Sequence, residues 1–450
     1  MRATGTAGSI ETVFLLLIFV MPFVAAPPMA ARIFDIPGLK LPNLVAALAF
    51  LIFLGTQRPP QRPDKLYRGA LVAFSAYLAF FTFAFVRSLP NVARFHSLLP
   101  ESFQAGLSEY WQSYYAVPVL FAFSFVYVLQ RMCSREGLLL SISAICAAIF
   151  VLSCAIIAVM LSHPDAIMNT DPSRTAISKL TGAYLGLHYN GAGTMYVIAG
   201  PLLLYMSLTR GSFWTVNLVA ALAAVLLLKS RTAIFTFAAM GAMTFIILGR
   251  TKILAAIAPL VLAGGLTVLG RVVVQLLSMG ITKGGISTFA LFSGREQAIW
   301  LPLLAEWLGD PNRLMWGAGL FGLMTSNFLY SVHSIFPTGE AHNFYLEFFL
   351  DNGIIMFAIF AVLLIGFLTW SWRLGRRLHT PLYWVLFLCV VSFLIAGFTG
   401  RRYFPESENF LMFPVLAMMI NAARLKLRDP NFTRSGKIDV VNNSDGFRAH

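Results

Sequence analysis

Arginine residues near the ends of long apolar segments are the first residues in this sequence that could do chemistry. Arg231 lies in Lys-Ser-Arg-Thr-Ala, Arg295 in Ser-Gly-Arg-Glu, and Arg401 and Arg402 in Gly-Arg-Arg-Tyr. A guanidinium group stays charged and its planar fork binds two oxygens at once, so a cluster of these arginines suits a phosphate or pyrophosphate ligand. The alternative for each arginine is that it reaches lipid headgroups or pairs with a nearby acid.

Histidine is the second candidate, because its imidazole can exchange protons near neutral pH. His342 lies in Gly339-Glu-Ala-His-Asn-Phe-Tyr-Leu-Glu347, where a helical pattern begins that continues into an apolar segment. Its side chain and that of Asn343 are expected just above the bilayer, at the level of a lipid headgroup. The alternative is a helix-start histidine bonded only to the backbone. His188 in Leu-His-Tyr-Asn is a similar but weaker candidate.

Motifs for other chemistries are missing from the sequence. It has no phosphate-binding Gly-rich loop and no GxSxG motif, and its cysteines lack the spacing of metal ligands. Acidic residues are rare within the apolar segments, which argues against a proton-coupled pump. The Asp and Glu residues outside these segments are not arranged as a metal-dependent glycosyl transferase would need. We therefore expect no metal and no cofactor.

The elements that must position these residues are membrane-spanning helices. The chain has 450 residues, of which 58% are hydrophobic and 12% charged, about half the charged fraction of a soluble globular protein. A spanning helix needs about 20 mostly apolar residues, and its backbone must be bonded within the segment. We expect an all-α, polytopic transmembrane bundle of about twelve spans. The segments lie near residues 12–27, 41–56, 69–87, 114–130, 137–161, 191–208, 212–228, 232–249, 253–275, 353–372, 381–398 and 409–423.

Basic residues fall in alternate connections between these segments, which indicates the side of the membrane that each connection faces. Both termini and the connections with clusters of Lys and Arg are expected in the cytoplasm. The connections near 87–113, 162–190 and 276–352 are expected outside. The candidate arginines lie on the outer side against this bias, and therefore need another reason to be there. The first apolar segment also fits a cleaved signal peptide, an alternative that the later spans disfavour.

The external connection over 276–352 is far longer than the others, and long loops in compact proteins are usually functional. Its segment from Glu296 to Leu308 fits a short amphipathic helix, and a Gly-rich patch follows. Residues 1–428, including this loop, are predicted to form one transmembrane domain. Residues 429–450 are polar and are predicted to be a disordered cytoplasmic tail. The chain shows no repeat and no matching halves of the kind found in inverted-repeat transporters.

Four short motifs follow one another along the chain. They are Ser230-Arg-Thr-Ala233 leading into a span, Gly294-Arg295 early in the long loop, Trp316-Gly-Ala-Gly319, and Ala341-His-Asn-Phe-Tyr-Leu346 with Gly353 opening the next helix. The order of these motifs resembles that of the O-antigen ligase and O-antigen polymerase superfamily, which includes exopolysaccharide polymerases. The similarity covers about residues 180–370, whereas the run Leu187-His-Tyr-Asn-Gly matches the family only loosely.

This resemblance implies a membrane glycosyl transferase that moves a glycan from undecaprenyl pyrophosphate to an acceptor hydroxyl on the outer face of the bacterial inner membrane. No nucleotide sugar or metal takes part. Arg231 and Arg295 would hold the pyrophosphate, and His342 would be the base or would orient the acceptor. Asn343, Arg401 and Arg402 are further candidates. The expected partners are the lipid-linked glycan, an acceptor glycan or lipid A core, the bilayer and other polysaccharide-assembly proteins, and no nucleic acid.

Several functions remain open at this point. A polymerase of exopolysaccharide or O-antigen repeat units is slightly favoured over a ligase that attaches glycan to lipid A core. A transferase that glycosylates protein differs from both only in its acceptor. A transporter or flippase of lipid-linked glycans belongs to a different class. The single dominant loop and the missing repeat symmetry argue against the transporter.

Overall fold

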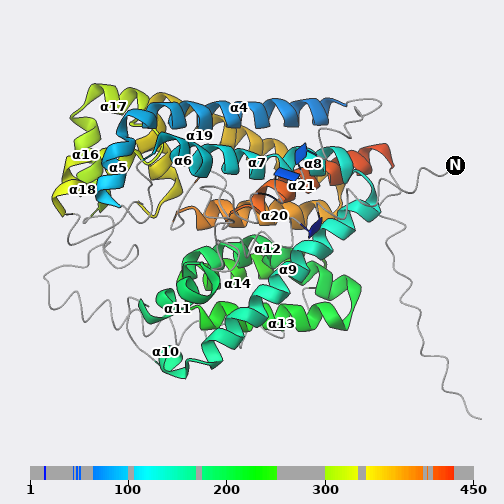
Figure 1. Ribbon diagram of the computed structural model, residues 1–450. Helices are drawn as coiled ribbons and strands as arrows, with labels where there is room; N and C mark the ends of the chain where they lie inside the picture. The colour runs from blue at the N-terminus through cyan, green and yellow to red at the C-terminus, as the bar shows by residue number, and fades with distance from the viewer. Residues whose placement is uncertain are drawn as a thin grey trace, which may run out of the picture.

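The computed structural model describes residues 64–99, 106–168, 175–250, 299–332, 341–398, 403 and 409–429, with a few isolated residues before residue 52. Every element within this part is a helix (Figure 1). The elements are α4 (Lys65–Ser88), η3 (Leu89–Asn91), α5 (Val92–Leu98), α6 (Leu107–Trp111), η4 (Gln112–Ala116), α7 (Val117–Ala122), α8 (Ser124–Arg131), α9 (Arg135–Leu161), α10 (Pro164–Met168), α11 (Thr175–Leu185), α12 (Tyr189–Arg210), α13 (Ser212–Leu227), α14 (Arg231–Ile247), α16 (Leu301–Leu308), α17 (Pro311–Trp316), η7 (Gly322–Thr325), α18 (Asn327–Val332), α19 (Phe344–Leu378), α20 (Pro381–Ala396) and α21 (Met412–Arg428).

Five helical stretches in the described part are long and apolar enough to cross a membrane, and α13, α14 and α20 are shorter apolar helices. The prediction of a helical membrane protein is thereby confirmed. The predicted segments 12–27, 41–56 and 253–275 lie largely or wholly outside the described residues, as does the tail after Asp429. Each other predicted segment overlaps one helix, except 114–130, which covers η4, α7 and α8 in succession. The five long stretches are Lys65–Leu98, Leu107–Arg131, Arg135–Leu161, Tyr189–Arg210 and Phe344–Leu378.

The core of the bundle is built around α12, which packs against α9, α13, α14 and α20. Small residues on α12 let its neighbours approach closely, as is common between helices in membranes. A Cβ atom at Gly193 would lie 3.0 Å from that of Ala233, and one at Gly200 would lie 3.0 Å from the Phe237 ring. α14 is therefore held tightly along α12, and the beginning of each helix lies beside that of the other.

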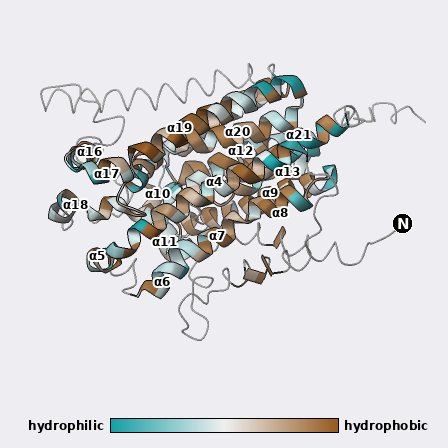
Figure 2. Ribbon diagram, turned by 90° about the horizontal axis from the view of Figure 1, so that it is seen from above, coloured by the Kyte–Doolittle hydropathy of each residue, from teal (hydrophilic) through white to brown (hydrophobic). Residues whose placement is uncertain are grey.

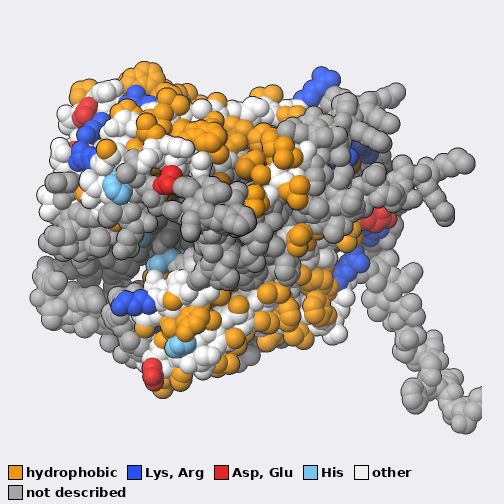
Figure 3. Space-filling view, viewed as in Figure 1, with side chains coloured by type: hydrophobic (Ala, Val, Ile, Leu, Met, Phe, Trp, Pro, Cys, Tyr) orange, Lys and Arg blue, Asp and Glu red, His pale blue; other side chains and the backbone are white. Residues whose placement is uncertain are grey.

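Two ends of the bundle can be told apart by their polar contacts. At one end Asp64 caps α4 through the Tyr67 amide and pairs with Arg424 at 2.8 Å and Arg428 at 2.9 Å. Burial raises the pKa of Asp64, but the hydrogen bond from Arg424 and the nearby positive charges outweigh it and hold this pKa below its usual value. The His side chains visible in Figure 3 lie toward the opposite end. That opposite end contains the beginnings of α12, α14 and α19.

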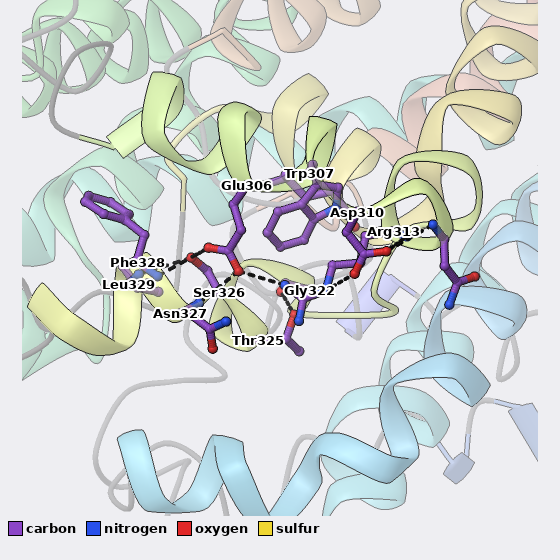
Figure 4. A network of polar contacts seen from close by, with 12 residues as sticks. Glu306, Trp307, Asp310, Arg313, Gly322, Thr325, Ser326, Asn327, Phe328 and Leu329 are labelled. Carbon is purple, nitrogen blue, oxygen red and sulfur yellow. Dashed lines mark hydrogen bonds and ion pairs between the residues drawn. The ribbon is translucent and has the colours of Figure 1, made fainter.

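The described part of the long loop is folded around the Glu306 carboxylate (Figure 4). Glu306 accepts hydrogen bonds from the Ser326 hydroxyl, from the Asn327 and Phe328 amides and from the Arg313 guanidinium. Burial raises the pKa of Glu306, but these hydrogen bonds and the Arg313 charge outweigh it and leave that pKa below its usual value. The predicted short helix is present as α16 and ends at Leu308 as expected, while residues 296–298 at its predicted beginning lie outside the described part.

The Gly-rich patch of this loop packs against a break in α19. Gly353 has φ 76° and ψ 176°, which interrupts the helix, and Gly317 has φ 71°. Beside them the amides of Ala318 and Gly319 donate to the carbonyls of Leu350 and Asp351, each at 2.9 Å. Two glycines in left-handed conformations thus let the loop backbone lie directly on the backbone of the broken helix.

Replacing Gly317 with alanine should destabilise the protein strongly. A Cβ atom there would lie 2.2 Å from the Asp351 carbonyl oxygen, and a non-glycine residue at positive φ adds about 1 to 3 kcal/mol of strain. We expect a lower melting temperature and a lower yield of monodisperse protein in detergent. Gly366→Ala, in α19 with nothing within 4 Å of its Cβ position, is the control. Equal stability of the two variants would contradict the packing described here.

Candidate functional site

His342 lies where the long loop enters α19, and its backbone adopts φ 54°. Few residues other than glycine adopt this left-handed conformation, and they do so where the surrounding structure enforces it. The preceding residue is held on both sides, since the Ala341 amide donates to Glu347 Oε1 at 2.8 Å and its carbonyl accepts from Trp300 Nε1 at 2.8 Å. The His342 side chain is half-buried.

The residues after His342 are fixed equally firmly. Asn343 is the N-cap of α19, and its Oδ1 accepts from the Tyr345 amide at 3.0 Å and the Leu346 amide at 3.1 Å. The Phe344 amide donates to the Gly397 carbonyl at the end of α20, at 2.9 Å. Residues 341–344, which we call the corner, therefore hold the backbone of His342 in a fixed position. Asn343 builds that corner through its side-chain oxygen, a structural role that the sequence does not distinguish from substrate binding.

Asp351 and Asn352 form a buried polar group about two turns further along α19. Asp351 accepts from the Gly322 amide at 2.7 Å and from the Tyr403 hydroxyl at 2.9 Å. Asn352 donates to the same hydroxyl at 3.1 Å. Burial and the Asp351 charge raise the pKa of Tyr403, so its hydroxyl is neutral and donates. Tyr403 directly follows Arg402 in the chain, while Arg401 and Arg402 themselves lie outside the described residues.

A second group of polar residues lies at the beginnings of α12 and α14. The Ser230 hydroxyl donates to Asn190 Oδ1 at 3.1 Å, and the His188 Nδ1 accepts from the Asn190 amide at 3.2 Å. Ser230 is the N-cap of α14, and Arg231 is the first residue of that helix. The structure thus joins the Ser-Arg-Thr-Ala motif to the first turn of α12, within the run Leu187-His-Tyr-Asn-Gly that matches the family only loosely. Arg231's side chain and all of Arg295 lie outside the described part.

Both groups lie at the same end of the bundle because α20 links them. α20 packs along α12 and α14, and the residue after it accepts the hydrogen bond from Phe344. The amino-terminal ends of α12, α14 and α19 therefore point to one side of the molecule (Figure 1). The helix dipole gives each helix beginning a partial positive charge, so this side favours an anionic group.

Metal binding finds no support in the described residues, where no three His, Cys, Asp or Glu side chains form a group that could hold an ion. Two buried carboxylates on α19 already accept hydrogen bonds from protein groups. Glu347 accepts from the Ala341 amide, and Asp351 accepts from an amide and a hydroxyl. Within the described corner, His342 is the side chain best suited to proton exchange.

No protein-family model matches the chain, and a search of curated proteins finds no match. The resemblance to the O-antigen ligase and polymerase superfamily therefore rests on the motifs themselves. What the structure adds is their physical role. The glycines of Trp316-Gly-Ala-Gly319 and Gly353 shape the backbone, whereas the Ser-Arg-Thr-Ala and Ala-His-Asn motifs begin helices at one end of the bundle.

Proposed function

We propose that this protein transfers a glycan from undecaprenyl pyrophosphate to an acceptor sugar hydroxyl at the outer face of a bacterial inner membrane. In this proposal the chain crosses the bilayer about twelve times, both termini are cytoplasmic and the loop over 276–352 is external. The observation that carries the proposal is His342, which is held in a left-handed backbone at the end of the bundle where the Arg231 backbone also lies.

The proposed reaction is a displacement at the anomeric carbon. The acceptor oxygen attacks that carbon, the bond to the pyrophosphate oxygen breaks, and the electron pair leaves with the pyrophosphate. The proton of the acceptor hydroxyl passes to the His342 imidazole, or to another acceptor that His342 orients. Arg231 and Arg295 stabilise the charge that develops on the leaving group. The pyrophosphate is a good leaving group, so neither a nucleotide nor a metal is required.

Arg401 and Arg402 fit the same proposal as further contacts to the pyrophosphate. Tyr403 anchors the chain next to them through its bond to Asp351, and its carbonyl accepts a hydrogen bond from the Tyr77 hydroxyl at 3.2 Å. Asn343 contributes by fixing the position of His342, as its capping bonds indicate. Other polysaccharide-assembly proteins are proposed partners.

Polymerisation of repeat units is the preferred form of this activity, and ligation to lipid A core is the alternative. Deleting the gene and separating the surface glycans by electrophoresis tests the choice. Loss of long polymer with single units retained supports polymerisation. Loss of all glycan from lipid A core, with lipid-linked polymer accumulating, supports ligation. Unchanged surface glycan of every kind would contradict both.

The proposed topology predicts opposite labelling on the two sides of the Leu107–Arg131 stretch. Ser97 and Cys133 are exposed and lie beyond its two ends. A membrane-impermeant maleimide should label Ser97→Cys in cells whose outer membrane has been permeabilised, in a background lacking other cysteines. Cys133 alone should react only after lysis. The reverse labelling pattern would contradict the proposed orientation in the membrane, and with it a reaction at the outer face.

The bond between Asn190 and Ser230 should position Arg231. Asn190→Ala should lower transfer by about tenfold, because one neutral hydrogen bond contributes about 0.5 to 1.5 kcal/mol. Ser230→Ala should have a similar effect. The two substitutions together should cost little more than either alone, since they remove the same bond. Kinetics of the three purified variants measure this, and fully additive losses would show that the bond has no part in transfer.

A further inference from the structure

The outward face of α16 is apolar, although this helix belongs to a loop that is not a predicted span. Leu301 is 53% exposed and Leu308 67% exposed, and Ala305 lies between them on the same face. The spacing of three and four residues places these side chains in one stripe along the helix. Large aliphatic side chains gathered in one exposed stripe normally mark an interaction surface.

Two charged residues of these helices, Glu306 and Arg313, are bonded within the loop, whereas Asn312 is exposed and the Asp310 side chain is 44% exposed. Glu306 is enclosed by bonds from Ser326 and Arg313, and Arg313 also pairs with Asp310 at 3.2 Å (Figure 4). The Arg313 guanidinium lies over the Trp307 ring, with its Cζ atom 5.3 Å from the ring centroid. A helix pair that faces water has the opposite arrangement, with charges outside and aliphatic side chains inside. The outward face of α16 is therefore built for an apolar neighbour, and the exposed face of α17 is apolar at Met315 and Trp316.

The stripe continues along α17 and reaches the exposed surface of α19. Met315 and Trp316 are exposed at the end of α17. A Cβ atom at Gly353 would lie 2.4 Å from the Met315 carbonyl oxygen, so α17 ends directly on the break in α19. Ile354 follows that break and is exposed.

From Ile354 onward the exposed apolar side chains run along α19, one of the five stretches able to cross a membrane. They include Val362, which is 70% exposed. Figure 2 shows α17 beside one end of this hydrophobic helix, and Figure 3 shows hydrophobic side chains along the edge where α17 lies.

We propose that the outward face of α16 and α17, formed by Leu301, Ala305, Leu308, Met315 and Trp316, lies in the interfacial region of the lipid bilayer. Its continuity with the lipid-facing side of α19 selects lipid as the occupant. The position of Trp316 agrees with this, because its indole ring combines an apolar body with a polar N–H group and is favoured at the membrane interface. The inference does not depend on the glycan-transfer activity, and it holds for either side of the membrane.

Accessibility measurements with a spin label test this proposal. The protein without native cysteines would carry a nitroxide at Leu308→Cys, in vesicles of equal parts phosphatidylethanolamine and phosphatidylglycerol. Collisions with oxygen, which concentrates in lipid, would be compared with collisions with a nickel chelate, which stays in water. Val362→Cys is the lipid-facing reference and Cys133 alone is the water-facing reference. We expect the ratio of oxygen to nickel collisions at Leu308 to shift from the Cys133 value toward the Val362 value.

Two results would overturn the proposal. A ratio like that of Cys133 would mean that the stripe faces water. Low collision rates with both reagents would mean that a protein covers the stripe, either a second copy or another part of this chain. Leu301→Cys provides an independent position on the same stripe and must give the same ratio as Leu308→Cys if lipid covers both.

Discussion

Arg231→Ala should lower glycan transfer by at least about a hundredfold without reducing the amount of folded protein. A bidentate grip on pyrophosphate comprises two charge-assisted hydrogen bonds of about 1.5 to 3 kcal/mol each, and about 1.4 kcal/mol corresponds to a factor of ten in rate. The residue opens α14 directly after the buried N-cap Ser230, so its backbone position is fixed by the packing of α14 on α12. Transfer assays on purified protein measure the loss.

Two variants test whether the loss of activity at position 231 comes from the missing charge, from the missing guanidinium geometry or from general damage to the protein. Arg231→Lys should recover only part of the activity, because an ammonium group keeps the charge but cannot bind two oxygens in the same plane. Arg210→Ala removes an arginine from the far end of α12 and should leave activity near normal. If Arg210→Ala were as damaging as Arg231→Ala, the assignment of Arg231 to the pyrophosphate would lose its basis. Arg295→Ala is expected to match Arg231→Ala.

His342→Ala should lower turnover by about 10²- to 10⁴-fold while the lipid-linked donor still binds. A sugar hydroxyl is too weak an acid to lose its proton before attack, so a base must accept the proton as the new bond forms. The backbone on each side of His342 is anchored by the hydrogen bonds of Ala341 and Phe344. Turnover and donor affinity are measured separately on the purified variant.

The left-handed backbone of His342 requires a second variant, because alanine adds strain there. Asn adopts this conformation more readily than most residues, so His342→Asn removes the imidazole while keeping the corner intact. It should lose as much turnover as His342→Ala. His163→Ala is the control, since the His163 imidazole bonds to the carbonyl of Val159 within its own helix end. Full activity of His342→Asn would remove the imidazole from the mechanism.

The long apolar helices of the described part could be predicted from sequence because each lies along a long apolar run with polar ends. α13, for example, begins and ends within one residue of the predicted 212–228 segment. The helical pattern predicted to begin within 339–347 is present as the turns that start at Phe344, and the predicted span over 353–372 starts at the break at Gly353. The break itself could not be predicted, because it depends on the packing of the loop backbone against α19.

The site was predictable in its residue types but not in its connections. The sequence indicates His342 and Arg231, yet it gives no sign that Asn190 bonds to Ser230, because these residues are far apart in the chain. Their only shared signal is that each stands at the start of an apolar run. The glycines at 317 and 353 are visible in the sequence as a pattern, but their mutual packing depends on the fold of the long loop. The roles of His342, Arg231, Arg295, Arg401 and Arg402 stay predictions.

Reconstituted transfer tests the central claim most directly. The purified protein would be placed in vesicles containing undecaprenyl-pyrophosphate-linked glycan, with a metal chelator and no nucleotide, and the lipid products would be identified by mass spectrometry. The proposal predicts lengthened glycan together with one free undecaprenyl pyrophosphate for each bond formed, and neither product with Arg231→Ala. Donor that stays intact but moves between the two leaflets would contradict the proposal and identify a transporter instead.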